Sequence, residues 1–190
     1  MKYLLIALVA ALLFVPFLGA VHLFDQEEIN LATAAHEMVM SRHYSTVQIN
    51  SRPFPPLFVW MQAGSMLLFG VNDVAVRFPN AVIGVITLVL LFGIGKKLVD
   101  ERLGFWWALV YAGSWLPHLF LKSGISDPVF NFFIFLSIYF AFRTGYNSKS
   151  LRMAIFSGLF LGLAVLTNGL AAIIPVLLCL LISWIWNKGK

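Results

Sequence analysis

Long runs of apolar residues alternate with short polar segments along most of this chain. A helix needs about 20 apolar residues to cross the hydrocarbon core of a bilayer, and several of these runs approach that length. Backbone N–H and C=O groups in lipid must bond within their own segment, which favours helices. We therefore predict an all-α, polytopic membrane protein with about six transmembrane helices, at residues 3–21, 74–95, 103–119, 128–142, 153–166 and 170–186.

The first apolar run has a second interpretation, because a signal peptide also places an apolar run after a basic N-terminus such as Met1-Lys2. The run from Tyr3 to Val21 exceeds the length of about 7–15 residues that is usual for the apolar part of a signal peptide. Leu18-Gly19-Ala20 is also a poor match to the small-x-small pattern of a cleavage site. The pattern favours an uncleaved first helix.

The one long polar stretch, residues 22–56, contains a further helical pattern. Between Ile29 and Met40, apolar residues recur at the 3.6-residue period of one helix face. Prolines 53, 55 and 56 then break the chain, and the apolar segment Leu57–Phe69 that follows is too short to span a bilayer. We predict two interfacial amphipathic helices in one loop, within residues 25–70.

The composition supports a membrane protein. Hydrophobic residues make up 61% of the chain and charged residues 11%, whereas soluble domains average about 45–50% and about 25%. The mean hydropathy is +0.90. Cys179 is the single cysteine, so an intramolecular disulfide framework is excluded.

The thirteen basic residues predict a topology. With the N-terminus in the cytoplasm, nine of them lie on the inner side and four on the outer side, which is the positive-inside bias. The net charge of +5 therefore reflects membrane orientation, and the absence of a basic stripe with interleaved aromatic residues argues against nucleic-acid binding. The inner set is Lys2, Lys96, Lys97, Arg102, Arg143, Lys149, Arg152, Lys188 and Lys190, and the outer set is Arg42, Arg52, Arg77 and Lys122.

Carboxylates gather on the predicted outer side, where six of the eight lie, and bilayer topology gives no reason for this. Asp25-Gln26-Glu27-Glu28 reads either as a capping box, with Asp25 as N-cap and Glu28 at N3, or as a functional acidic site. Ser126-Asp127-Pro128 reads likewise as a helix start or as a functional acid. Both acidic segments lie at outer helix starts, so we expect them to face one another across a membrane-level cavity.

Two basic residues, Arg77 and Lys122, are predicted on the same outer side. A buried arginine needs a phosphate or a carboxylate as partner, although Arg77 could instead extend to the lipid headgroups. The four histidines show no ligand spacing, so a divalent metal is not supported. From the residues alone, the outer cleft could bind a cation, a polar substrate or a lipid headgroup.

Several short motifs in one order resemble a known family: Leu23-Phe24-Asp25-Gln26-Glu27-Glu28-Ile29-Asn30, Ala35-His36-Glu37-Met38, Pro55-Pro56-Leu57-Phe58-Val59-Trp60, Leu68-Phe69-Gly70-Val71-Asn72, Arg77-Phe78-Pro79-Asn80, Ser126-Asp127-Pro128 and Gly162-Leu163-Ala164-Val165-Leu166-Thr167. The set resembles the N-terminal half of membrane glycosyltransferases related to the protein O-mannosyltransferases, glycosyltransferase family 39. The aminoarabinose transferases of lipid A belong to the same group. The resemblance implies a GT-C fold, and that the chain is the N-terminal portion of a longer transferase.

The resemblance also implies a reaction and a set of residues. Such enzymes transfer a sugar from a polyprenyl-phosphate donor to an acceptor hydroxyl on the periplasmic side, and an acid in the first outer loop serves as general base. Glu27 falls at the position of the catalytic aspartate and Glu28 at the acid after it. Asp127 and Arg77 match an acid and an arginine of the family, and we expect them to bind substrate together with Lys122 and Asp25.

Two departures from the family concern lysines. Phe54 stands where the family has a lysine expected to meet the donor phosphate, and Asn168 stands where it has a second lysine. Three functions remain open at this point: a glycosyltransferase, a catalytically degenerate subunit that binds lipid-linked sugar, and a small transporter. For the first, the expected partners are a polyprenyl-phosphate-linked sugar, a lipid or protein acceptor and membrane lipids, at a bacterial inner membrane.

Overall fold

The computed structural model describes residues 2–44, 48–49, 52–146 and 151–188, and these residues are almost entirely helical. The predicted all-α class is confirmed, with one two-stranded antiparallel ladder that the sequence did not predict. The elements are α1 (Lys2–Phe14), α2 (Gln26–Ser41), β1 (Gln48–Ile49), β2 (Arg52–Pro53), α3 (Leu57–Phe69), α4 (Asp73–Leu98), α5 (Glu101–Gly113), α6 (Trp115–Leu121), α7 (Asp127–Tyr146), α8 (Leu151–Asn168), a 3-10 turn η1 (Gly169–Ala172) and α9 (Ile173–Lys188).

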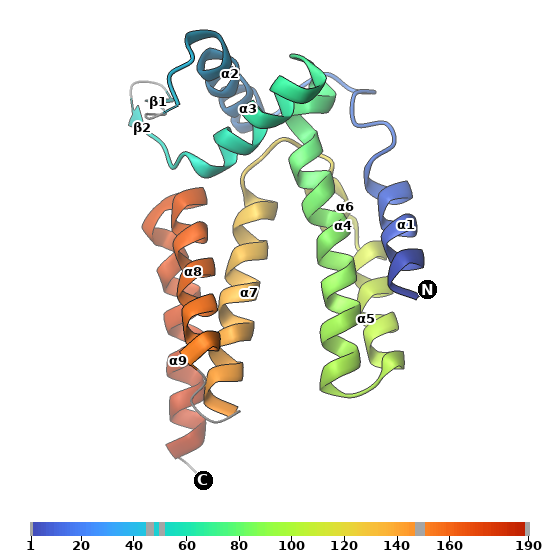
Figure 1. Cartoon of the computed structure of the whole chain (residues 1–190), viewed down its shortest axis with the longest axis vertical. Helices are drawn as coiled ribbons and strands as arrows, with labels where there is room; N and C mark the ends of the chain where they lie inside the picture. Colours follow the sequence, from blue (N-terminus) through green and yellow to red (C-terminus); the bar gives the residue numbers. More distant parts are fainter. Residues whose placement is uncertain (1, 45–47, 50–51, 147–150, 189–190) are drawn as a thin grey trace.

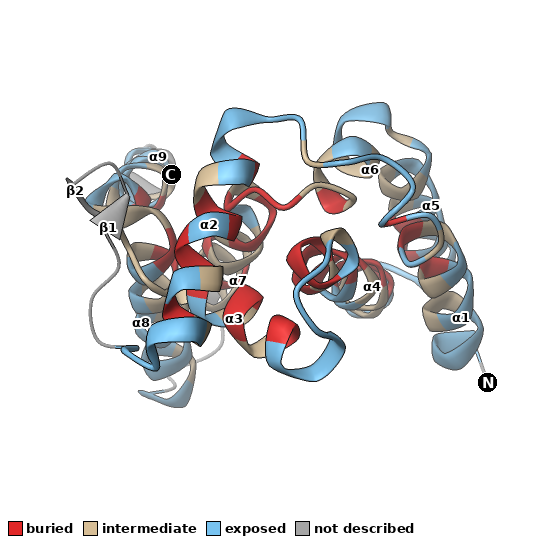
Figure 2. Cartoon of the chain, turned by 90° about the horizontal axis from the view of Figure 1, so that it is seen from above, coloured by how far each residue is buried: buried red, intermediate tan, exposed pale blue. Residues whose placement is uncertain are grey.

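The helices form two upright groups joined across one end by α2 and α3 (Figure 1). The first group contains α1, α4, α5 and α6, and the second contains α7, α8 and α9. Helix α4 is central, because it packs against α1, α3, α5, α6 and α7. Seen from above, the buried residues gather on the facing sides of α2, α3 and α4, and the outward sides of the surrounding helices are exposed (Figure 2).

Helix α1 is shorter than predicted, since it ends at Phe14 and the expected span continued to residue 21. Pro16 disfavours helical backbone at the residue before it and has no N–H to continue the ladder. Phe17 then adopts a left-handed backbone, with φ of 64°, and the chain turns. The linker after α1 thereby presents its carbonyl groups to another helix, as described below.

Two other predicted spans are interrupted. The segment 103–119 is divided at Ser114, whose backbone is extended, into α5 and α6. Pro117 is compatible with this break because it lies in the first turn of α6, where its missing N–H removes no helical bond. The first residues of the segment 170–186 belong to the 3-10 turn η1, whose first residue, Gly169, has a left-handed φ of 74°. The chain reverses there, so that α9 runs back in the direction opposite to α8 and packs against α7 (Figure 1).

Two stretches of the described chain are long and apolar enough to cross a membrane by length and composition, Asp73–Leu98 and Leu151–Ser183, and the second contains the reversal at η1. The prediction of six spans and two interfacial helices therefore stays a prediction. Leucines and isoleucines cover the outward surfaces of α1, α8 and α9, including Leu12, Ile174 and Ile182. Lys149 and Lys190, two of the inner cations in the predicted topology, lie outside the described residues.

Candidate functional site

The site begins at the N-terminus of α2. Asp25 caps this helix as predicted, because its Oδ1 accepts a hydrogen bond from the backbone N–H of Glu27 at 2.8 Å. Of the two interpretations left open for this segment, the capping box fails at Glu28, which is completely buried and bonds to Arg77. The residue that sequence pattern assigned to a local cap therefore makes its contacts with distant parts of the chain.

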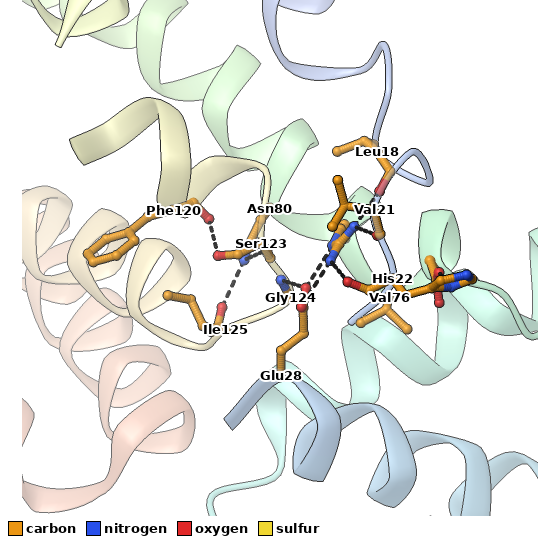
Figure 3. Close-up of polar contacts among 12 residues, drawn as sticks. Leu18, Val21, His22, Glu28, Val76, Asn80, Phe120, Ser123, Gly124 and Ile125 are labelled. Atoms are coloured by element: carbon orange, nitrogen blue, oxygen red, sulfur yellow. Dashed lines mark hydrogen bonds and ion pairs between the residues drawn. The ribbon is translucent and has the colours of Figure 1, made fainter. Parts of the chain in front are cut away.

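Glu28 pairs with Arg77 of α4 inside the protein. The Nε–H of Arg77 donates to Glu28 Oε1 at 2.7 Å and its Nη2–H donates to Oε2 at 3.0 Å, which is a bidentate arrangement. The side chains of Glu28 and Arg77 are 0% and 4% exposed, so water does not screen their attraction. Glu28 Oε1 also accepts the backbone N–H of Gly124 at 2.6 Å (Figure 3).

The rest of the Arg77 guanidinium holds the linker after α1. Its Nη1 donates to the carbonyl oxygens of Leu18 at 2.7 Å and Val21 at 2.6 Å, and its Nη2 donates to that of His22 at 3.3 Å. All five N–H donors of the arginine are thus used within the protein. Loss of one partner of such a buried pair costs about 3–5 kcal/mol, because the other charge stays buried and unpaired.

The loop between α6 and α7 is held by two buried amides that the sequence analysis missed. Asn80 Nδ2 donates to the carbonyl oxygens of Ser123 at 2.7 Å and Ile125 at 2.8 Å. Gln62 Nε2 donates to that of Gly124 and to that of Val76, each at 3.1 Å. Both residues are fully buried, in helices whose residues are mostly apolar. Burying an amide in apolar surroundings costs free energy unless the amide is hydrogen-bonded. An amide within a mostly apolar helix was therefore the signal that the sequence offered.

Glu28, Asn80 and Gln62 together fix the loop that leads into Ser126 and Asp127. Figure 3 shows Glu28 rising from α2 toward Gly124, with Leu18 and Val21 on one side and Asn80 and Ile125 on the other. A Cβ at Gly124 would lie 2.5 Å from Val76 Cγ1 and 3.0 Å from Glu28 Oε1. The loop can therefore approach α2 and α4 this closely only with glycine at that position.

The two acidic segments meet at this loop, where Glu27 contacts the residue before Asp127, and the cavity expected between them stays a prediction. Glu27 Oε1 accepts hydrogen bonds from the Oγ of Ser126 at 2.8 Å and from its backbone N–H at 3.3 Å, across 99 positions of sequence. Asp127 is the first residue of α7 and precedes the expected span 128–142. Burial raises the pKa of the Asp127 carboxyl, and the nearby negative charge of Glu27 raises this pKa further.

Comparison with known proteins places this arrangement in a family. Residues 53–190, most of the chain, match the family described as dolichyl-phosphate-mannose-protein mannosyltransferase. The chain belongs to this family. The resemblance drawn from the ordered motifs is therefore confirmed.

Two relatives align with nearly the whole chain. The undecaprenyl phosphate-alpha-4-amino-4-deoxy-L-arabinose arabinosyl transferase 2 of Pseudomonas fluorescens (strain Pf0-1) is 31% identical over 180 residues, which are 90% of this chain and 32% of that protein. The corresponding arabinosyl transferase of Shewanella sediminis (strain HAW-EB3) is 24% identical over 177 residues, 90% of this chain and 32% of that protein. The chain thus spans about a third of the length of these relatives.

The fold is that of a solved relative, ArnT from Cupriavidus metallidurans. Its apo structure matches with a TM-score of 0.84 over 96% of this chain and 35% of that chain, at 19% identity. Its structure bound to undecaprenyl phosphate matches with a TM-score of 0.80 over 90% of this chain and 33% of that chain, also at 19% identity. At this identity the likeness establishes the ArnT-like fold.

The remaining predicted cation, Lys122, is half-buried at the base of the same loop, and its Nζ donates to the carbonyl oxygen of Pro16 at 3.2 Å. The two positions at which the mannosyltransferase relatives were expected to carry lysine hold Phe54, which packs against the core, and Asn168 at the end of α8. Within the described residues, no group of three or more His, Cys, Asp and Glu side chains is arranged to hold a metal ion.

Proposed function

We propose that this chain forms the catalytic N-terminal part of a membrane glycosyltransferase that moves a sugar from a polyprenyl-phosphate donor to an acceptor hydroxyl. The observation that carries the proposal is the meeting of Glu27 with Ser126-Asp127 beside a buried structural ion pair. Membership of the mannosyltransferase family supports the reaction class. The chain spans only about a third of its relatives, so further parts of such an enzyme would complete the site.

Glu27 is the proposed general base. Glu27 is an exposed residue whose Oε1 is oriented by Ser126 through a part-buried hydrogen bond, while Oε2 has no hydrogen bond among the described residues. Oε2 would accept the proton of the acceptor hydroxyl while the oxygen of that hydroxyl attacks the anomeric carbon of the sugar. The bond from that carbon to the phosphate oxygen breaks, the polyprenyl phosphate leaves with the electron pair, and the configuration inverts.

Asp127 is proposed to bind the sugar or the acceptor beside Glu27. Its raised pKa increases the protonated fraction, and a protonated carboxyl can donate a hydrogen bond to a substrate oxygen. Asp25 caps α2 with Oδ1 and keeps Oδ2 available among the described residues. Asp25 is proposed to contact the substrate through Oδ2 alone, because the cap occupies Oδ1.

Arg77 and Glu28 are proposed to position the site, which revises the roles expected from sequence. Arg77 has no N–H left for a donor phosphate, and both oxygens of Glu28 are bonded. Lys122 is the cation proposed for the leaving phosphate, because an ammonium has three donors and the Pro16 carbonyl occupies one. A cation there would stabilise the charge that develops on the departing phosphate.

Placement in a membrane follows from the apolar outward surfaces and from the family. We propose the predicted six spans, a cytoplasmic N-terminus and a periplasmic acidic end in a bacterial inner membrane. The ArnT structure bound to undecaprenyl phosphate supports a polyprenyl-phosphate-linked sugar as donor. A lipid or protein hydroxyl is the expected acceptor.

The proposal is tested by Glu27→Gln, assayed with the full-length protein in its own membranes for transfer from a radiolabelled polyprenyl-phosphate sugar. Loss of a general base lowers the rate by about 10²–10⁴-fold. Glu37→Gln is the matched control, since Glu37 is an exposed acid on the same helix, and it should retain full activity. Normal transfer by Glu27→Gln would remove Glu27 from the base role.

A second candidate is a subunit that binds lipid-linked sugar without transferring it. Phe54 and Asn168 favour it, because the lysine expected to meet the donor phosphate and a second lysine of the family are both absent. This candidate predicts that wild type and Glu27→Gln bind the donor equally and that neither transfers the sugar. Transfer by the wild type excludes it.

A further inference from the structure

A cleft of about 360 Å³ lies between α4 and α7 at the end of the helices that is opposite to the acidic site. Its walls are mostly apolar, and its polar lining comes from Tyr3, Lys97, Tyr139 and Arg143. The volume falls within the range of about 300–1,000 Å³ that is typical of small-molecule sites. An apolar cleft with two cations at its edge has the chemistry of an anionic amphiphile site.

The acidic residues at this end are already engaged. Glu101 accepts hydrogen bonds from Lys2 and from Lys96, the latter at 3.0 Å. Asp100 caps α5 through the backbone N–H of Leu103 at 2.7 Å. No ion pair joins Lys97 or Arg143 to an acid among the described residues. The two cations that line the cleft therefore lack a counter-charge in the part of the chain that is described.

Arg143 is held in a defined orientation. Its Nη1 donates to the phenol oxygen of Tyr139 at 3.3 Å, one helical turn earlier, and its guanidinium carbon lies 5.9 Å from the centre of that ring. A guanidinium held over an aromatic ring is pre-oriented and keeps most of its N–H donors for a partner. Lys97 is exposed at the end of α4 on the other side of the cleft.

The cleft is far from the acidic site. Asp127 and Arg143 lie on the same helix, and 16 residues at 1.5 Å each place them ~24 Å apart along its axis. This separation approaches the hydrocarbon thickness of about 30 Å, so the two sites would lie near opposite faces of a bilayer. A donor that must reach Glu27 cannot also place its phosphate between Lys97 and Arg143.

We propose that this cleft binds an anionic phospholipid of the opposite leaflet, with the phosphodiester between Lys97 and Arg143. One acyl chain would lie along the apolar walls formed by Leu90, Leu136 and Phe140. Basic clefts between transmembrane helices on the cytoplasmic side are suited to such headgroups. The proposal rests on the membrane placement proposed above and is independent of the transfer reaction.

Native mass spectrometry of the full chain, released from nanodiscs, tests the proposal with phosphatidylglycerol and phosphatidylcholine as probes. We expect retained phosphatidylglycerol and little phosphatidylcholine. Lys97→Gln and Arg143→Gln should each weaken phosphatidylglycerol retention about fivefold, and Lys97→Arg should restore it. Arg152→Gln is the matched control, because Arg152 is an exposed cation at the same end that does not line the cleft.

Equal retention of the two lipids, or an equal loss in Arg152→Gln, would overturn the proposal, since either result indicates only general attraction at the membrane surface. Inorganic phosphate at millimolar concentration should not displace the lipid, because the apolar cleft holds its acyl chain. Displacement would indicate a simple anion site and would also overturn the proposal. Glu27→Gln should retain the lipid fully, which separates failure of this site from failure of the proposed transferase.

Discussion

At the residue scale, two adjacent glutamates of α2 have opposite environments. Successive side chains on a helix diverge by about 100°, so Glu27 and Glu28 face different directions. Glu28 is completely buried and pairs with Arg77, whereas Glu27 is exposed and reaches Ser126. The buried pair joins α2, α4, the linker after α1 and the loop before α7, and this assembly determines where Glu27 and Asp127 lie.

Asp127 gives a prediction about pH, because burial and the charge of Glu27 raise the pKa of its carboxyl in the folded protein. The folded state then binds this proton more tightly than the unfolded state does. The resulting stability is fully present below the ordinary aspartate pKa and is lost as pH rises through the folded value. At neutral pH we expect Asp127→Asn to unfold at a temperature equal to or above that of wild type, although it loses transfer.

Thermal unfolding in detergent at pH 4 and pH 7.5 checks this prediction. The unfolding temperature of Asp127→Asn, measured relative to that of wild type, should be higher at pH 7.5 than at pH 4. Glu27→Gln should lower the Asp127 pKa, since it removes one of the two causes. The opposite result, a relative unfolding temperature of the variant that is lower at pH 7.5 than at pH 4, would contradict the prediction. It would mean that the ionised Asp127 carboxylate stabilises the fold.

Sequence pattern predicted the residues of the site better than their partners. The cap by Asp25 could be predicted because it depends on neighbours within two positions. The partner of Arg77 could not be assigned, since Glu28 is 49 positions away and a local cap also explained an acid there. Gln62 and Asn80 were missed because nothing in the local sequence indicates that their amides hold a loop more than 40 positions later.

At the element scale, helix ends that nearby residues determine could be predicted from sequence, whereas helix ends that contacts with distant residues determine could not. The range Leu57–Phe69 was predicted as a helix and is α3, because prolines precede it and Gly70 follows it with a left-handed φ of 79°. The segment 3–21 was predicted as one helix and stops at Phe14. Arg77 takes the carbonyl groups of Leu18 and Val21, which a continued helix would have used internally.

The contact between α4 and α5 leads to a prediction about two glycines of α5. A Cβ at Gly104 would lie 2.4 Å from the carbonyl oxygen of Phe92, so backbone would have to move. Gly104→Ala should therefore lower the free energy of unfolding by about 1–3 kcal/mol. Gly113→Ala is the control, because a Cβ at Gly113 would have no neighbouring atom within 4 Å. Alanine is more favourable than glycine in a helix by up to about 1 kcal/mol, so this variant should not be destabilised. Equal unfolding temperatures for the two variants would show that α4 and α5 are not in close contact.

At the scale of the whole molecule, charge differs between the two ends of the helices. Helix α2 and the first residues of α4 and α7 lie at one end, so Glu27, Asp73 and Asp127 share it (Figure 1). Lys2, Lys96 and Arg143 lie at the other end, where Glu101 joins two of these cations. The apolar outward surfaces run between the two ends, as expected for a protein whose ends face different aqueous compartments.

This asymmetry predicts that the acidic end faces outward and the basic end faces the cytoplasm. Single cysteines at Glu37→Cys and Arg102→Cys, in a Cys179→Ala background, place exposed thiols at the two ends. A membrane-impermeant maleimide should label Glu37→Cys in intact cells and Arg102→Cys only after permeabilisation, because the bilayer separates the reagent from the inner thiol. The reverse pattern would invert the orientation and move the proposed transfer reaction to the cytoplasmic side. Labelling of both thiols in intact cells would mean that the two ends do not lie on opposite sides of the membrane. The proposed lipid site at the basic end would then not lie in the cytoplasmic leaflet.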